Sequence, residues 1–203
     1  MAATKPGKTE TLAAFFDDGT YTALYTDGPV SAAYGCANGQ SVYVVFQNGQ
    51  PLDVNDIEKN IRVLAMAAQT GAPVVTFYNS NGACLEGGLA LLNANSRLMA
   101  EIARISGVVP QIAVVVGTCA GSAAVQAAAA DVCIMSEEGE LFLNAPFNSE
   151  DKVEKAGGSA FAARAGVAAI VGKGAGGAGG PGGAAGPHRR PDAFEQPGGP
   201  GCF

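Results

Sequence analysis

The 203-residue chain is poor in the side chains from which acid–base and metal sites are usually built. Its one histidine, His188, lies in a Gly/Pro-rich stretch near the C-terminal end, which argues against a Ser-His-Asp or Cys-His arrangement. The five cysteines form no C-x-x-C pair, so we expect neither a zinc ribbon nor another metal site. No segment has the form G-x-x-x-x-G-K-[ST] of a phosphate-binding loop. A reaction that needs no protein nucleophile and no metal is therefore favoured.

Basic residues and long apolar runs are also scarce. Twelve Lys and Arg against 18 Asp and Glu give a formal net charge of −6. Nucleic-acid binding and docking on an anionic membrane both need a basic face, so neither partner is expected. No apolar run reaches the roughly 20 residues of a membrane helix, and the N-terminal segment does not have the pattern of a secretory signal. These observations favour a cytoplasmic protein without membrane insertion.

Apolar periodicity predicts helices and strands in alternation. Asn38-Gly39 between two apolar runs predicts a hairpin of strands 30–35 and 41–46. Further strands are predicted over 73–78, 111–116, 131–135 and 140–143, and helices over 9–16, 53–70, 85–106 and 123–130. Asp53 or Asn55 is the expected N-cap of the second helix. Strands without polar alternation are buried on both faces, so we expect an α/β fold with a mostly parallel, helix-covered sheet.

Two glycine-containing turns each follow a buried strand and open a helix, N-S-N-G at 79–82 and G-T-C-A-G-S at 117–122. Unpaired N–H groups at such turns attract anions, either a phosphate or the oxyanion that develops when a thioester forms an enolate. A plain structural turn is the third interpretation. Glu86, beside the first turn, is either a general base or a charge at the helix N-terminus.

Longer motifs around these turns resemble a known family. S-G-V-V-P-Q-I-A-V-V-V-G-T-C-A-G-S-A-A at 106–124 resembles the S-G-V-x-P-Q-I-x-x-x-x-G-P-C-A-G-G-A motif of biotin-dependent acyl-CoA carboxyltransferases. N-S-N-G-A-C-L-E-G at 79–87 resembles the family's D-S-G-G-A-R-x-x-E-G segment, and L-F-L-N-A-P at 141–146 its F-[LI]-T-G-P segment. Order and spacing agree from about Phe16 to Val171. The match is to the N-terminal carboxyltransferase domain, within the ClpP/crotonase-like superfamily.

This resemblance implies a crotonase-like superhelix of ββα units in a single domain over residues 1–171. It implies a carboxyltransferase component that moves a carboxyl group between biotin, attached to a separate carrier protein, and an acyl-CoA of the acetyl-, propionyl- or malonyl-CoA type. The implied partners are a second carboxyltransferase subunit or domain and the biotin carboxyl carrier protein, in a homo- or hetero-oligomer. No metal ion is implied.

The resemblance also implies the site residues. Backbone N–H groups of the two turns would hold the thioester enolate, and neighbouring residues would line the acyl-CoA site. The donors are Gly82, Ala83, Gly121 and Ser122, and the lining residues are Cys84, Glu86, Gly87 and Ala120. The chain departs from the family pattern at several positions, among them Asn81 and Ser122 for Gly, Cys84 for Arg, Thr118 for Pro, and Asp53-Val54-Asn55 for a G-G-S segment. A crotonase-type hydratase or decarboxylase without biotin, and a non-catalytic subunit of a carboxylase complex, are the alternative interpretations.

The composition changes abruptly at Gly172, where a stretch rich in Gly and Pro begins and runs to Phe203. Such a composition is typical of a disordered tail. A frameshift is the other interpretation, because residues 191–197, back-translated and read one nucleotide later, can spell the L-P-S-N-N motif that the family carries at about this distance.

Overall fold

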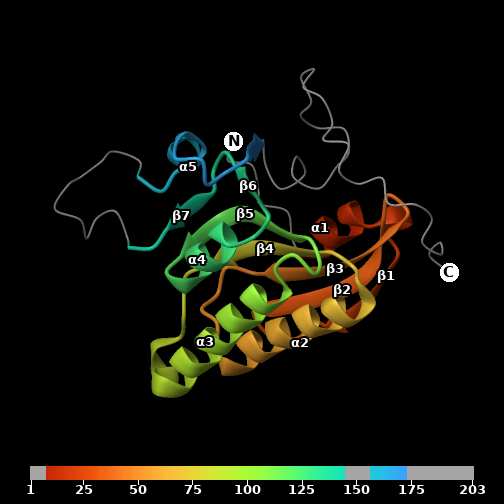
Figure 1. The fold of residues 1–203 in the computed structure, drawn as a ribbon, viewed down its shortest axis with the longest axis horizontal. Coiled ribbons are helices and arrows are strands. Elements are labelled where there is room, and N and C mark those ends of the chain that lie inside the picture. The colour runs from red at the N-terminus through yellow and green to blue at the C-terminus, as the bar shows by residue number, and fades with distance from the viewer. Residues whose placement is uncertain (1–7, 145–155, 173–203) are drawn as a thin grey trace.

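A computed structural model describes residues 8–144 and 156–172 (Figure 1). Of the predicted tail 172–203, Gly172 is strand and residues 173–203 lie outside the described residues, as does the part of the 141–146 motif from residue 145 onward. One sheet has the strand order β1-β2-β3-β4-β5-β6-β8. Strand β7 also pairs with β5, at residues 118–120, after the part of β5 that pairs with β6. The strands of this sheet are β1 (Tyr21–Tyr25), β2 (Val30–Ala37), β3 (Gln40–Gln47), β4 (Val74–Ser80), β5 (Gln111–Ala120), β6 (Val132–Ser136), β7 (Glu140–Phe142) and β8 (Ile170–Gly172).

The helices connect and cover these strands. They are α1 (Lys8–Phe15), α2 (Val54–Thr70), α3 (Gly88–Ile105), α4 (Ser122–Ala128) and α5 (Ser159–Arg164), with short 3₁₀ helices η1 (Asp17–Gly19) and η2 (Leu85–Gly87). Strands β1 to β3 pair antiparallel, whereas the pairs from β3 to β8 are parallel. The expected α/β fold with a mostly parallel sheet is confirmed. No helix of the described residues is long and apolar enough to cross a membrane.

The predicted hairpin is confirmed, and its turn is held from outside. Asn38 and Gly39 have φ of +52° and +73°, the two positive values that a tight hairpin turn requires. The Asp17 carboxylate accepts both of their N–H groups, each at 2.8 Å. Asp17 therefore ties η1 to the far end of the β2–β3 hairpin.

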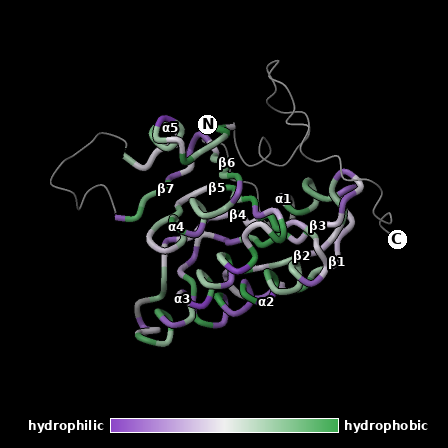
Figure 2. Tube along the Cα trace, viewed as in Figure 1, coloured by the Kyte–Doolittle hydropathy of each residue, from purple (hydrophilic) through white to green (hydrophobic). Residues whose placement is uncertain are grey.

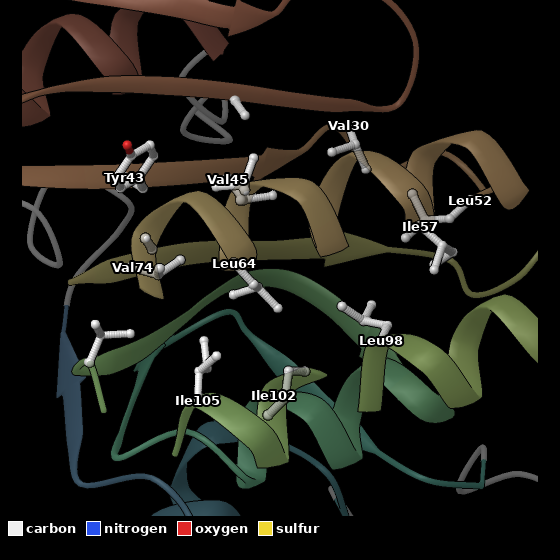
Figure 3. Packing of buried hydrophobic residues seen from close by; sticks show 14 of the residues in the cluster. Val30, Tyr43, Val45, Leu52, Ile57, Leu64, Val74, Leu98, Ile102 and Ile105 are labelled. Atoms are coloured by element: carbon white, nitrogen blue, oxygen red, sulfur yellow. The ribbon is translucent and has the colours of Figure 1, made fainter. Parts of the chain in front are cut away.

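The two faces of the sheet are covered differently. Helices α2 and α3 lie side by side on one face, where Leu64 and Leu98 belong to the same buried cluster as Val45 of β3 and Val74 of β4 (Figures 1 and 3). Apolar and polar residues recur along both helices at helical spacing (Figure 2), so each buries one side. On the opposite face, Leu12 of α1 and Phe16, just after α1, pack against another set of strand residues. The central strands are consequently buried on both faces, as their apolar sequence indicates.

Helix α2 begins with a capping box. Asp53 Oδ1 accepts the Asp56 N–H at 2.8 Å, and Asp56 Oδ2 accepts the Asp53 N–H at 3.1 Å. Asp53 is thus the cap, and the alternative cap Asn55 is an exposed helical residue. Asp56 is buried, and this burial raises its pKa. Lys59 Nζ lies 3.6 Å from Asp56 Oδ1 and donates to the Asp27 carbonyl at 2.7 Å, which fastens the β1–β2 connection to α2.

Some element boundaries differ from those predicted. Strand β5 continues through Gly117, Thr118 and Cys119 to Ala120, so most of the predicted second turn is strand. The reason is a long-range pairing, because residues 118–120 pair with β7. Strand β4 likewise continues to Ser80, and a 3₁₀ turn precedes α3, whose α-helical part starts at Gly88. Edge strand β1 was not predicted.

We expect Asp53→Ala to lower the free energy of unfolding by about 1 kcal/mol, because the Asp56 N–H loses its acceptor at the helix start. Asn55→Ala, at the neighbouring cap-type residue, should change it by less than about 0.5 kcal/mol. Urea unfolding followed by circular dichroism measures both. Equal losses for the two variants would contradict the assignment of the cap.

Candidate functional site

The two glycine turns lie side by side at one edge of the sheet. Strands β4 and β5 are parallel neighbours, with Ser80 opposite Cys119 as their last recorded pair. Gly82 follows Ser80 by two residues, and Gly121 follows Cys119 by two residues. Because the carboxyl ends of parallel strands meet at the same edge, the structure brings together the two segments that the sequence placed 39 positions apart.

The first turn is anchored to the β3–α2 connection. Gly82 has φ of +102°, which favours glycine, and its N–H donates to the buried Ser80 Oγ at 3.1 Å. The Leu52 N–H donates to the Gly82 carbonyl at 3.0 Å, and the Cys84 N–H donates to the Leu52 carbonyl at 2.9 Å. Of the two donors predicted here, Gly82 is therefore engaged within the protein. Ala83 is exposed, and no acceptor for its N–H is found among the described residues.

The second turn is anchored to β7. Gly121, with φ of +65°, donates its N–H to the Phe142 carbonyl at 3.0 Å, and so extends the β5–β7 ladder by one bond. Ser122 and Ala123 open α4, and a first helical turn has no preceding turn whose carbonyls could accept its N–H groups. As at the first turn, the glycine N–H is engaged within the protein, and no acceptor for the N–H of the following residue is found among the described residues. Ala83 and Ser122 are thus the two predicted donors that remain for a ligand.

The sequence and the fold are both similar to those of known proteins. Residues 4–173 match the carboxyl transferase domain family. The chain belongs to that family. It is 33% identical over 141 residues to the biotin-dependent acetyl-/propionyl-coenzyme A carboxylase beta6 subunit of Mycobacterium tuberculosis, a match that covers 66% of this chain and 30% of that protein.

Two solved structures share the fold of this carboxyl transferase domain. The beta subunit of P. aeruginosa geranyl-CoA carboxylase superposes with a TM-score of 0.78 and 25% identity, over 85% of this chain and 37% of that one. A chain of the Pseudomonas malonate decarboxylase MdcD-MdcE hetero-dimer superposes with a TM-score of 0.71 and 24% identity, over 79% and 76% of the two chains. The expected crotonase-like fold is confirmed. The chain spans less than a third of the length of the curated relatives it matches, 17% in one and 30% in another.

The residues predicted to line the acyl-CoA site of this carboxyl transferase domain lie around the same edge. Cys84 is half-buried and enters η2, where Glu86 is exposed. Ala120 is the last residue of β5 and pairs with Phe142. Gly87, the last residue of η2, lies tightly against α3, because a Cβ on Gly87 would be 2.8 Å from Leu91 Cβ. This packing does not show whether Gly87 also contacts a ligand, so that role stays a prediction.

The buried hydroxyl and thiol groups behind the turns do not supply reactive anions. Burial raises the pKa of the Cys119 thiol, and the nearby Cys133 raises it further. Burial also raises the pKa of Cys133 and that of Tyr78, and for Tyr78 the two cysteines add to the effect. These groups stay protonated at neutral pH and fill the core. No cluster of three or more His, Cys, Asp or Glu suited to a metal ion occurs in residues 8–144 and 156–172.

The structure shows contacts at this edge that the sequence analysis missed. Asn79 lies against Gly117 of the neighbouring strand, so closely that a Cβ on Gly117 would be 2.2 Å from Asn79 Oδ1 and 3.4 Å from Asn79 Cβ. Glycine inside a buried strand is a sequence signal for such a close approach. No comparable signal marks Ser80, or Asn95 of α3, whose Oδ1 accepts the Ser122 hydroxyl at 3.1 Å.

We expect Gly117→Ala to lower the free energy of unfolding by about 1–3 kcal/mol, because the added methyl group overlaps the Asn79 amide and forces β4 and β5 to adjust. Asn79→Ala removes the overlapping atoms and should recover most of that loss in the double variant. Urea unfolding of the wild type, both single variants and the double variant measures the coupling. Additive losses would show that Asn79 is not what restricts residue 117.

Proposed function

We propose that this carboxyl transferase domain binds an acyl-CoA and takes part in moving a carboxyl group between that thioester and biotin on a separate carrier protein. The observation that carries the proposal is the pairing of the two turns. Each ends one of two neighbouring parallel strands, and each leaves one N–H group, of Ala83 and of Ser122, available at the same edge. Family membership supports the reaction type, and the Mycobacterium tuberculosis relative, a biotin-dependent acetyl-/propionyl-coenzyme A carboxylase subunit, supports biotin and a short acyl-CoA.

The two N–H groups would act on the charge that forms during the reaction. Exchange of a carboxyl group for the α-proton balances because the biotin nitrogen that gives up the carboxyl group would take up the proton lost by the acyl α-carbon. Loss of that proton moves negative charge onto the thioester oxygen. Donors held by a rigid backbone stabilise that oxygen more in the enolate than in the ground state, which is how such sites lower the barrier. Glu86 is exposed at the first turn, and we assign it no proton transfer.

Biotin enters this proposal as a group on a partner that supplies or accepts the carboxyl. The described residues offer no observation that places it, so we assign it no contact with this chain.

A second carboxyltransferase subunit or domain is part of the proposal, together with the carrier protein and a cytoplasmic location. The start of α3, just beyond the first turn, supports a partner, because Leu89 is 83% exposed there and Leu92 is 65% exposed. Large apolar side chains this exposed beside a site mark an interaction surface.

Ser122→Pro tests the donor role directly. Proline is favoured at the first position of a helix, where its missing N–H costs no helical hydrogen bond, so the variant removes the proposed donor without breaking α4. Its matched control, Ser122→Ala, keeps the N–H. In the complex isolated through a tag on this chain, carboxyl transfer with propionyl-CoA should be about 10²- to 10³-fold slower for Ser122→Pro than for Ser122→Ala.

The same assay separates the alternative functions. Avidin, which sequesters biotin, should abolish the wild-type activity. Turnover of an acyl-CoA that avidin leaves unchanged would indicate a hydratase or decarboxylase without biotin. A complex with biotinylated protein but without turnover or acyl-CoA binding would indicate a non-catalytic subunit. Equal rates for the proline and alanine variants would remove Ser122 from the oxyanion site.

We expect Leu92→Asp to prevent association with the second subunit, because it places a charge in an apolar contact. Val108→Asp is the matched control, since Val108 is 61% exposed but lies beyond the other end of α3. Co-purification on the tagged chain, with a streptavidin blot for the biotinylated carrier and size-exclusion chromatography for the complex, provides the readout. Loss of the complex in both variants, or in neither, would contradict this surface.

A further inference from the structure

We infer that Asn95 is a positioning residue for the second turn: it holds the Ser122 side chain away from the thioester oxygen site, so that the Ser122 N–H stays open to the ligand. The inference rests on the proposed function, because it assigns a role within that site. Asn95 itself would touch neither substrate nor biotin.

The hydrogen bonds of Asn95 define the orientation of its amide. Its Nδ2 donates to the Leu91 carbonyl of the same helix at 3.1 Å. The Oδ1 atom therefore faces α4, where it accepts the Ser122 hydroxyl at 3.1 Å and lies 3.5 Å from Gln126 Nε2. Gln126 is 5% exposed, so its side chain is also held in place. One oxygen on α3 thus meets two residues one helical turn apart on α4.

This arrangement answers a difficulty raised by the sequence. Residue 122 is serine where the resembling motif has glycine, so a hydroxymethyl group is added beside an N–H that must approach the thioester. A hydroxyl without a partner can turn to nearby backbone groups or fill the space of the ligand oxygen. Bonded to Asn95, it is directed toward α3.

The same contact links the two turns through one helix. Helix α3 starts at Gly88, directly after the first turn, and Asn95 follows seven residues later, about 10 Å along the helix axis. A rigid helix thereby carries the exit of the first turn at its start and the anchor of the second turn two helical turns on. The relative position of the Ala83 and Ser122 N–H groups depends in part on this contact.

A double-mutant cycle with two ligands tests the inference. Asn95→Ala, Ser122→Ala and the double variant of the full-length chain are titrated calorimetrically with propionyl-CoA and with free CoA, which lacks the thioester carbonyl. We expect Asn95→Ala to raise the Kd for propionyl-CoA by about 3- to 10-fold, the effect of one hydrogen bond, and to leave the Kd for CoA unchanged. Ser122→Ala removes the hydroxyl that has to be held and keeps the N–H, so this variant and the double variant should both bind propionyl-CoA within about twofold of the wild type. Ser96→Ala is the control, since that hydroxyl bonds only the Leu92 carbonyl of its own helix.

Each outcome decides between the inference and the proposed function. A wild type that binds propionyl-CoA no better than CoA overturns the proposed function, and the inference with it. A wild type that prefers propionyl-CoA, with an Asn95→Ala variant that binds it equally well or better, overturns the inference alone. Equal weakening of Asn95→Ala toward CoA and propionyl-CoA, or a double variant that binds propionyl-CoA as weakly as Asn95→Ala, also overturns it, because loss of a merely structural contact would act in that way.

Discussion

The parallel pairing of β4 with β5 is the constraint on which the candidate site depends. Parallel neighbours end at the same edge of a sheet, so two segments distant in sequence deliver their turns to one place. The pairing needs close approach near its end, where Asn79 of one strand occupies the space above Gly117 of the other. The catalytic proposal therefore rests on strand geometry more than on any reactive side chain, in keeping with the single histidine and the protonated buried thiols.

Much of the fold could be predicted because its signals are local. Asn38-Gly39 carries the positive φ values of a hairpin turn, and Asp53 supplies a cap three residues before an acidic partner. Apolar spacing along residues 54–70 and 88–105 follows the helix period, which fixes which sides are buried. The two turns were found for the same reason, since a buried strand followed by glycine and then a helical pattern is a local sequence.

The remaining features depend on contacts between distant residues. Strand β5 runs to Ala120 because β7 pairs with it, and nothing near residue 117 encodes that partner. The sequence predicts Gly82 and Gly121 as donors in the same way as Ala83 and Ser122. In the structure, however, Ser80 Oγ accepts the Gly82 N–H and the Phe142 carbonyl accepts the Gly121 N–H. Which donors remain for a ligand is decided by the fold around each turn. The role of Asn95 is of the same kind, because its oxygen and the Ser122 hydroxyl belong to different helices.

The proposed acyl-CoA ligand raises the question of which groups would balance its negative charge. An acyl-CoA ligand carries phosphates as well as a thioester, and phosphates are usually bound by cations. Position 84 holds cysteine where the resembling motif has arginine, and several basic side chains of the described residues are already paired: Lys59 with Asp56, Arg97 with Glu58 and Arg104 with Glu101. In the proposed site, the backbone donors hold the thioester oxygen when the ligand binds and stabilise it further once the enolate forms, so they would contribute to rate as well as to affinity. The CoA phosphates would need other contacts, and the proposed partner beside α3 is one source of them.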